Sequence, residues 1–353
     1  MRPPFAAFKI PRISCRDQWL RRTPCAFLTE RRTRGSVPKP RNRKSGSIPY
    51  AGEVRLIRRY RYFCWAAWLL LIPGFAALQA QKNEGFRVIS WTPATLQSGS
   101  PVLFRIELEQ PATEVDGTWL NHPLVFTRGA QGNTWFALAG IDVEQAPGSY
   151  SLDLSAAGST GHPLRASREV AVHPGSYKTT TLHVEEKYVQ PDAATLQRIA
   201  ADKAVKDAAF AHLTPQPLWR GDFRSPVRFS PTDSFGTRRM FNGTLASIHR
   251  GTDFHAPSGT PVVAANDGKV MIAQGMFYEG NLVVIDHGQQ FTTMYMHLSK
   301  IEVKVGERVT KGQRIGLSGA TGRVTGPHLH MSARWQEMYV DPVLLLGLKL
   351  PTP

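Results

Sequence analysis

The sequence predicts a mainly β protein in which two β domains are joined by a short helical connector. Alternating apolar and polar runs, separated by turn residues, fill residues 84–175. Val- and Ile-rich runs punctuated by glycine fill residues 222–350, and the one long helical pattern lies between the two regions. With 353 residues, the chain is long enough for two or three domains with cores of their own.

The first 80 residues differ from the β regions in charge and composition. We interpret residues 1–53 as a basic low-complexity segment that precedes the true start of the protein, with an unusually long leader as the alternative. Residues 54–80 combine a basic cluster, an uncharged apolar run and a small residue, Ala80. This pattern predicts a signal peptide, or a membrane anchor if it is not cleaved. We therefore expect an exported protein of the periplasm or cell envelope, with membrane contact through this segment alone.

Residues 84–175 form the first predicted β domain. The runs 102–108, 134–138 and 149–154 alternate with a period of two, and turn residues such as Gly99 and Pro147-Gly148 separate them. Short strands of this kind predict an immunoglobulin-like β-sandwich. Its histidines are scattered, so we expect no catalytic site there.

Residues 176–221 are predicted to be a connector with one strand, over 180–189, and one helix. The helix runs from Asp192, a plausible N-cap, to about Leu213 and is followed by Pro215 and Pro217. Residues 222–350 are predicted to be all-β, because short apolar runs alternate there with glycine-containing turns.

Charge excludes nucleic-acid binding by the predicted domains, and cysteine content excludes a metal site with thiolate ligands there. Of the formal net charge of +16, residues 1–61 account for +14, so the predicted domains are close to neutral and have no basic stripe for nucleic acid. All three cysteines lie within the first 64 residues. A transition metal bound in the predicted domains must therefore be held by histidine and carboxylate side chains.

The candidate site lies in residues 222–350. His328 and His330 are one residue apart in a β-prone run, so both project from one face of a strand. The same region contains His249, Asp253 and His297, in segments short enough to converge. A catalytic zinc ion takes three protein ligands and leaves one position for water. Five candidates exceed that need and leave imidazoles for acid–base catalysis.

These residues also resemble a known family. His249-x-x-x-Asp253 together with His328-x-His330 resembles the signature of the lysostaphin/LytM-type zinc metallopeptidases, a peptidoglycan DD-endopeptidase family. The resemblance covers residues 234–341, about a third of the chain. Further matching segments follow in the family order: GTPV at 259–262, DHG at 286–288, YMHLS at 295–299, VTKGQRIG at 309–316 and GATG at 319–322.

The resemblance implies a fold, a cofactor and a role for each site residue. It implies a LytM/lysostaphin-like domain of the duplicated-hybrid-barrel type in residues 222–350, with Zn²⁺ held by His249, Asp253 and His330. His297 and His328 are then the histidines that do not bind the metal, one or both acting as general base and the other as oxyanion stabiliser. The expected substrates are peptidoglycan stem peptides, and the sequence does not fix which bond is cut. The style of the signal peptide and the lack of a recognisable cell-wall-binding repeat favour, by analogy, D-alanyl to diaminopimelate cross-links over glycine bridges. The residues that bind the substrate are not predicted.

Two other functions compete with this one. Non-catalytic activators of cell-wall amidases resemble this domain but have lost metal ligands, whereas none of the five site residues is missing here. A lipoyl or biotinyl carrier shares the hairpin pattern of residues 305–316 but needs an exposed lysine in a Met-Lys turn, which this hairpin lacks. His255 and His287 are interpreted as surface or structural histidines, and Tyr295 and Met296 as packing residues.

Overall fold

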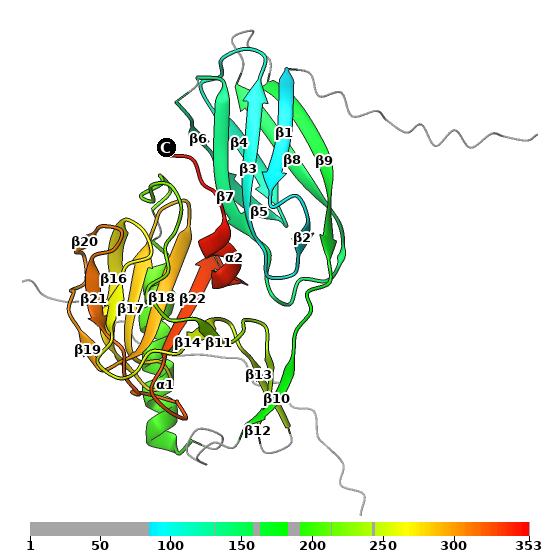
Figure 1. Ribbon diagram of the computed structural model, residues 1–353. Helices are drawn as coiled ribbons and strands as arrows, with labels where there is room; N and C mark the ends of the chain where they lie inside the picture. Colours follow the sequence, from blue (N-terminus) through cyan, green and yellow to red (C-terminus); the bar gives the residue numbers. More distant parts are fainter. Residues whose placement is uncertain are drawn as a thin grey trace, which may run out of the picture. The chain divides into compact units, whose positions relative to one another are not determined.

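The computed structural model describes residues 85–130, 132–157, 163–182, 191–212, 214–241 and 244–352. β-strands are their main secondary structure, as predicted (Figure 1). The basic segment 1–53 and the predicted signal peptide or anchor at 54–80 lie outside the described residues. Among the described helices, none combines the length and the apolar character that a membrane crossing requires.

The first β domain consists of two sheets. One has the strand order β1-β3-β7-β6 and the other β2-β9-β8-β4-β5. Their bounds are Phe86–Thr92 (β1), Leu96–Gln97 (β2), Pro101–Leu108 (β3), Val115–Trp119 (β4), His122–Val125 (β5), Thr127–Arg128 (β6), Thr134–Gly140 (β7), Gly148–Ala157 (β8) and Pro163–His173 (β9). The rings of Phe104 and Trp119, one from each sheet, meet edge to face at 5.4 Å between centroids. The two-sheet arrangement agrees with the predicted sandwich, and its immunoglobulin-like class stays a prediction.

The connector contributes one strand and one helix. Strand β10, Thr179–Leu182, covers the start of the predicted strand, and residues 183–190 lie outside the described part. Helix α1 spans Ala193–Phe210 and begins as predicted, because the Asp192 carboxylate accepts the Thr195 N–H at 2.7 Å. β10 pairs in parallel with β12, Arg238–Phe241, and β12 pairs with β13, Thr244–Ile248. The connector strand is thus part of a sheet that reaches into the predicted peptidase region.

The C-terminal region is built on a sheet of order β11-β14-β22-β18-β17-β16-β20, with β23 added beside β22 (Figure 1). A smaller sheet has the order β15-β21-β19. The bounds are Pro231–Asp233 (β11), Thr252–Phe254 (β14), Pro261–Val263 (β15), Gly268–Met276 (β16), Gly280–Asp286 (β17), Phe291–Leu298 (β18), Lys300–Ile301 (β19), Arg308–Val309 (β20), Arg314–Leu317 (β21), Leu329–Trp335 (β22) and Met338–Val340 (β23).

One prediction for this region is wrong in detail. Residues 222–350 are not all-β, because helix α2, Pro342–Gly347, follows the last strand. Asp341 caps this helix by accepting the Val343 N–H, and Pro342 occupies the first turn, where its missing N–H does no harm. This capped start is a helix signal within the predicted all-β region.

The large sheet presents two different faces, and β22 shows both. Leu329, Met331 and Ala333 are buried in the main hydrophobic core on one face. The alternating residues His330 and Ser332 therefore point to the other face. On that face a second apolar cluster of β16, β17 and β18 residues packs against Ala209 and Phe210 at the end of α1: Ile272, Met276, Leu282, Val284 and Met294. The candidate site and α1 thus share one face of the sheet.

Candidate metal centre

The site residues form a row across four neighbouring strands. Asp233 of β11 is opposite Asp253 of β14, and Asp253 is opposite His330 of β22. His330 is in turn opposite Met296 of β18, the residue before His297. Paired residues in an antiparallel sheet point to the same face, so strand register brings these side chains together although they are far apart in sequence.

The three predicted ligands meet at one point. Nε2 of His249 lies 3.1 Å from Oδ1 of Asp253 and 2.9 Å from Nδ1 of His330. Nδ1 of His330 lies 2.8 Å from the same carboxylate oxygen. All three side chains are largely buried, and their ligand atoms lie within 4.8 Å of one another. Two imidazole nitrogens and one carboxylate oxygen are a donor set that suits a divalent transition metal.

Hydrogen bonds on the far side of each ring fix which nitrogen faces the centre. Nδ1 of His249 lies 3.1 Å from the Ser234 carbonyl oxygen and 3.3 Å from Oδ2 of Asp233. Both oxygens only accept, so Nδ1 carries the hydrogen and the Nε2 lone pair faces the centre. Nε2 of His330 lies 2.9 Å from the Ser332 hydroxyl, which leaves Nδ1 for the centre. A second hydrogen-bond partner of this kind is typical of metal-binding histidines.

The electrostatics of the cluster favour a positive charge at the centre. Burial opposes ionisation of Asp253, but hydrogen bonds from His249 and His330 hold the pKa of its carboxyl group well below the usual range. Burial likewise lowers the pKa of His249, yet hydrogen bonds to Asp233 and Asp253 raise it overall. The guanidinium of Arg239 bonds the outer oxygens of both carboxylates, Oδ2 of Asp233 at 2.7 Å and Oδ2 of Asp253 at 3.0 Å. Oδ1 of Asp253 is left for the centre, so the residues fit a metal cation.

His297 reaches the site through an unusual backbone conformation. Alternation along β18 would send its side chain to the opposite face from Met296, but its φ of +63° is left-handed. Its ring lines the same cavity as that of His330, at 5.9 Å between ring centroids. The Nδ1 hydrogen is donated to the Thr321 carbonyl at 2.9 Å, so the Nε2 lone pair is unprotonated. Burial, followed by the nearby His330 and His328, lowers the pKa of His297 to about 3.

His328 lies beside His297, with 4.9 Å between ring centroids. Its Nδ1 donates to the Gly326 carbonyl at 2.9 Å, and its Nε2 lies 3.6 Å from Oδ1 of Asp253. The structure therefore brings together all five site residues that the sequence singled out, with both His297 and His328 in the tautomer that can accept a proton at Nε2.

The centre opens into a cavity of about 170 Å³. Its lining combines two of the candidate ligands and one candidate base with three arginines, one acid and several neutral residues: Arg239, Ser247, Ile248, His249, Arg250, Tyr278, Glu279, Met296, His297, Arg323 and His330. No sequence motif marks the supporting residues Asp233, Arg239 and Ser332, because their role depends on strand register.

The remaining histidines of the region behave as interpreted from the sequence. His255 is exposed, and His287 is fully buried with both ring nitrogens hydrogen-bonded. Tyr295 is also fully buried and packs in the core.

Comparison with known proteins identifies the family. Residues 247–342, which contain all five site residues, match the profile of peptidase family M23. The chain carries a peptidase family M23 domain. It is 42% identical to the peptidoglycan DD-endopeptidase ShyA of Vibrio cholerae over 157 residues. The match covers 44% of this chain and 32% of ShyA. The chain spans between 25% and 32% of the length of the first curated relatives it matches.

A solved structure assigned to peptidase M23 resembles the fold of this chain. A crystal structure assigned to peptidase M23 from Pseudomonas aeruginosa is 29% identical, with a TM-score of 0.54 and coverage of 71% of this chain and 95% of that chain. The catalytic domain of lysostaphin from Staphylococcus simulans is 35% identical, with a TM-score of 0.31 and coverage of 34% of this chain and 93% of that chain. The predicted metallopeptidase family is confirmed.

Proposed function

We propose that this M23 domain is a zinc-dependent endopeptidase that hydrolyses the peptide cross-links of bacterial peptidoglycan in the cell envelope. The observation that carries the proposal is the convergence of His249, Asp253 and His330 on one point, with two further imidazoles beside them. The M23 match and the name of the relative ShyA, a peptidoglycan DD-endopeptidase, support the substrate class.

In this proposal, zinc is held by Nε2 of His249, Oδ1 of Asp253 and Nδ1 of His330. Bound zinc supplies Lewis acidity and lowers the pKa of a coordinated water. The ion would take the place of the short contacts that these atoms make with one another. Asp233, Ser234 and Ser332 hold the two ligand rings at their far nitrogens.

His297 and His328 provide the acid–base chemistry. Both rings donate their Nδ1 hydrogen to a backbone carbonyl, so both offer Nε2 as a proton acceptor on the metal side. One ring removes the proton of the attacking water and delivers it to the leaving amine, and the other, protonated at Nε2 from solvent, stabilises the developing oxyanion. The fixed tautomers mean that neither ring needs to reorient before accepting a proton.

The cell envelope is proposed as the place of action because residues 54–80 have the composition of a signal peptide or anchor. We further propose that the scissile bond is the D-alanyl to diaminopimelate cross-link, in keeping with the name of ShyA.

The proposal is tested with the purified chain and isolated peptidoglycan. Released muropeptides are identified by mass spectrometry before chelation, after chelation and after zinc is restored. We expect cleavage to stop and recover, and His330→Ala to lose both zinc binding and cleavage. His255→Ala serves as the matched control, because His255 is exposed and outside the centre. Cleavage that ignores the chelator contradicts the proposal, and a His330→Ala variant with full biological activity favours the amidase-activator alternative.

A further inference from the structure

Helix α1 presents an unusual face to the sheet. Six residues at helical spacing are partly buried, while the rest of the helix is exposed: Thr195, Ile199, Asp202, Lys206, Ala209 and Phe210. A helix that packs only to complete a core places apolar residues at such positions. Here the two central positions are charged, and Leu196 points outward with 53% of its surface exposed. The middle of α1 is therefore built for specific polar contacts.

Both charged residues bind the short loop between β16 and β17. The Asp202 carboxylate accepts the Phe277 N–H at 2.7 Å. One turn further along the helix, the Lys206 ammonium forms an ion pair with the Glu279 carboxylate, and both side chains are mostly buried. Partial burial reduces solvent screening, so this pair is stronger than an exposed one. Two successive turns of α1 thus hold both ends of residues 277–279.

The same loop holds His297 and lines the catalytic cavity. The Glu279 carbonyl oxygen accepts the His297 N–H at 2.9 Å, at the residue whose φ is +63°. Tyr278 and Glu279 both line the cavity. Left-handed conformations of a non-glycine residue persist when surrounding contacts enforce them. The loop is one of two hydrogen-bonding supports of His297, the other being the Thr321 carbonyl at Nδ1.

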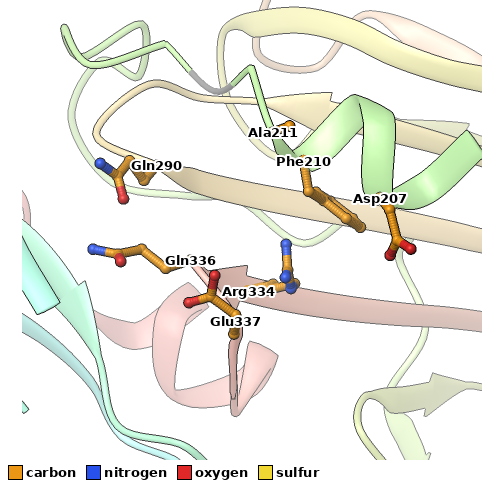
Figure 2. A pocket seen from close by; sticks show the side chains of 7 residues that line it. All are labelled: Asp207, Phe210, Ala211, Gln290, Arg334, Gln336 and Glu337. Carbon is orange, nitrogen blue, oxygen red and sulfur yellow. The ribbon is translucent and has the colours of Figure 1, made fainter. Parts of the chain in front are cut away.

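The C-terminal end of α1 is fixed at a second point. Figure 2 shows Phe210 and Asp207 of α1 and Arg334 of β22 among the residues that line a pocket of about 430 Å³, with Arg334 next to Phe210. The Arg334 guanidinium lies 3.9 Å from the centroid of the Phe210 ring. Arg334 is on the same face of β22 as His330, because the two positions differ by four residues in a strand. This contact anchors the helix and leaves Asp202 and Lys206 aimed at the loop.

We infer that α1 is a positioning element for catalysis, in which Lys206 and Asp202 hold residues 277–279 so that His297 keeps its left-handed conformation and its Nε2 faces the metal side. Lys206 acts through Glu279, and neither it nor Asp202 touches the ligand cluster. The inference rests on the proposed function of His297. It assigns to the connector helix a role in the reaction rather than a role as a spacer.

The test compares two lysines of the same helix in the full chain. Lys206→Met removes the ion pair with Glu279, and Lys203→Met is the matched control, because Lys203 is 71% exposed and pairs only with the exposed Asp207. Misplacement of a catalytic group by about 1 Å can reduce the rate about 100-fold, so we expect kcat to fall about tenfold in Lys206→Met. KM and zinc affinity should stay within about twofold, and Lys206→Arg should restore most of kcat.

A second readout does not depend on activity. The NMR signals of the His297 ring should move in Lys206→Met and stay in place in Lys203→Met. Equal kcat values and equal ring signals in the two methionine variants overturn the inference, as does a fall in zinc affinity as large as the fall in kcat. If the wild-type chain shows no zinc-dependent cleavage, the proposed function fails, and the ring signals still decide whether Lys206 positions His297.

Discussion

His287 makes the stability of the C-terminal region depend on pH. The ring is fully buried, and burial lowers its pKa to about 4 from the usual 6.5, against the opposing influence of the Asp267 carbonyl and the charges of Asp286 and Asp267. The folded protein therefore binds fewer protons at this residue than the unfolded chain between about pH 6.5 and pH 4. Stability is complete above this range and is lost as the pH falls through it.

A chain of hydrogen bonds explains why the neutral ring is required. Nδ1 of His287 lies 2.7 Å from the Asp267 carbonyl, which only accepts, so Nε2 must accept from the Thr293 hydroxyl at 2.7 Å. The Thr293 and Tyr295 hydroxyls are 2.9 Å apart, and Tyr295 also accepts the Ala265 N–H at 2.8 Å. A proton on Nε2 would turn the Thr293 hydrogen toward Tyr295 and leave the buried Tyr295 hydrogen without an acceptor.

The size of the effect follows from the two pKa values. A group that titrates near 6.5 when unfolded and near 4 when folded reduces the free energy of unfolding by about 2 kcal/mol between pH 7 and pH 5. We expect His287→Asn to be less stable than the wild type at pH 7, by about 1–3 kcal/mol, because the Thr293 hydroxyl loses its acceptor. Between pH 7 and pH 5, the free energy of unfolding of His287→Asn should fall by about 2 kcal/mol less than that of the wild type.

Urea unfolding at several pH values measures both quantities. The exposed His255 provides the control, since His255→Asn should keep the pH dependence of the wild type. Titration of the site histidines contributes equally to all three proteins and cancels in the comparison. Identical pH dependence in the wild type and His287→Asn would show that the buried ring does not titrate as the hydrogen-bond chain requires.

Three further outcomes are expected. Asp233→Asn should weaken zinc binding about 10- to 100-fold in competition with a chromophoric chelator, and unchanged affinity would exclude Asp233 as a support of the ligand ring. Gly251→Ala places a methyl group 2.3 Å from Nε2 of His330, so its zinc affinity should fall by about tenfold or more, whereas Gly347→Ala, with open space around it, should bind zinc normally. Tyr295→Phe should lower the free energy of unfolding by about 1–3 kcal/mol and leave kcat unchanged, because it leaves a buried backbone N–H without its acceptor.

Much of the architecture could be predicted from local patterns. The three alternating runs predicted strands β3, β7 and β8 of the first β domain, and Asp192 marked the start of α1. Helix α2 was missed although Asp341 and Pro342 signal a helix start, because the preceding strands suggested continuous β structure. Local patterns identify elements and caps, and they leave the class of the first domain as a prediction.

The sequence predicted which residues form the site, but not how they are arranged or which residues support them. The five candidate residues were identified by residue type and by the family resemblance, and their roles stay proposals. The supports Asp233 and Arg239 depend on the pairing of β11 with β14, which no single segment encodes. The left-handed φ of His297 could not be predicted either, since a histidine within a strand gives no sign of it. Tertiary contacts from the 277–279 loop and Thr321 impose that conformation.

The row of site residues across the sheet also determines when activity can begin. His249 and His330 are 81 residues apart in sequence, and His330 arrives on β22, which pairs with both β14 and β18. Until β22 inserts between these two strands, the chain has neither a complete ligand set nor two adjacent imidazoles. A chain that is still being synthesised or is only partly folded therefore lacks the assembled site on which the proposed activity depends. In the proposed function, hydrolysis therefore depends on the closure of this sheet around β22.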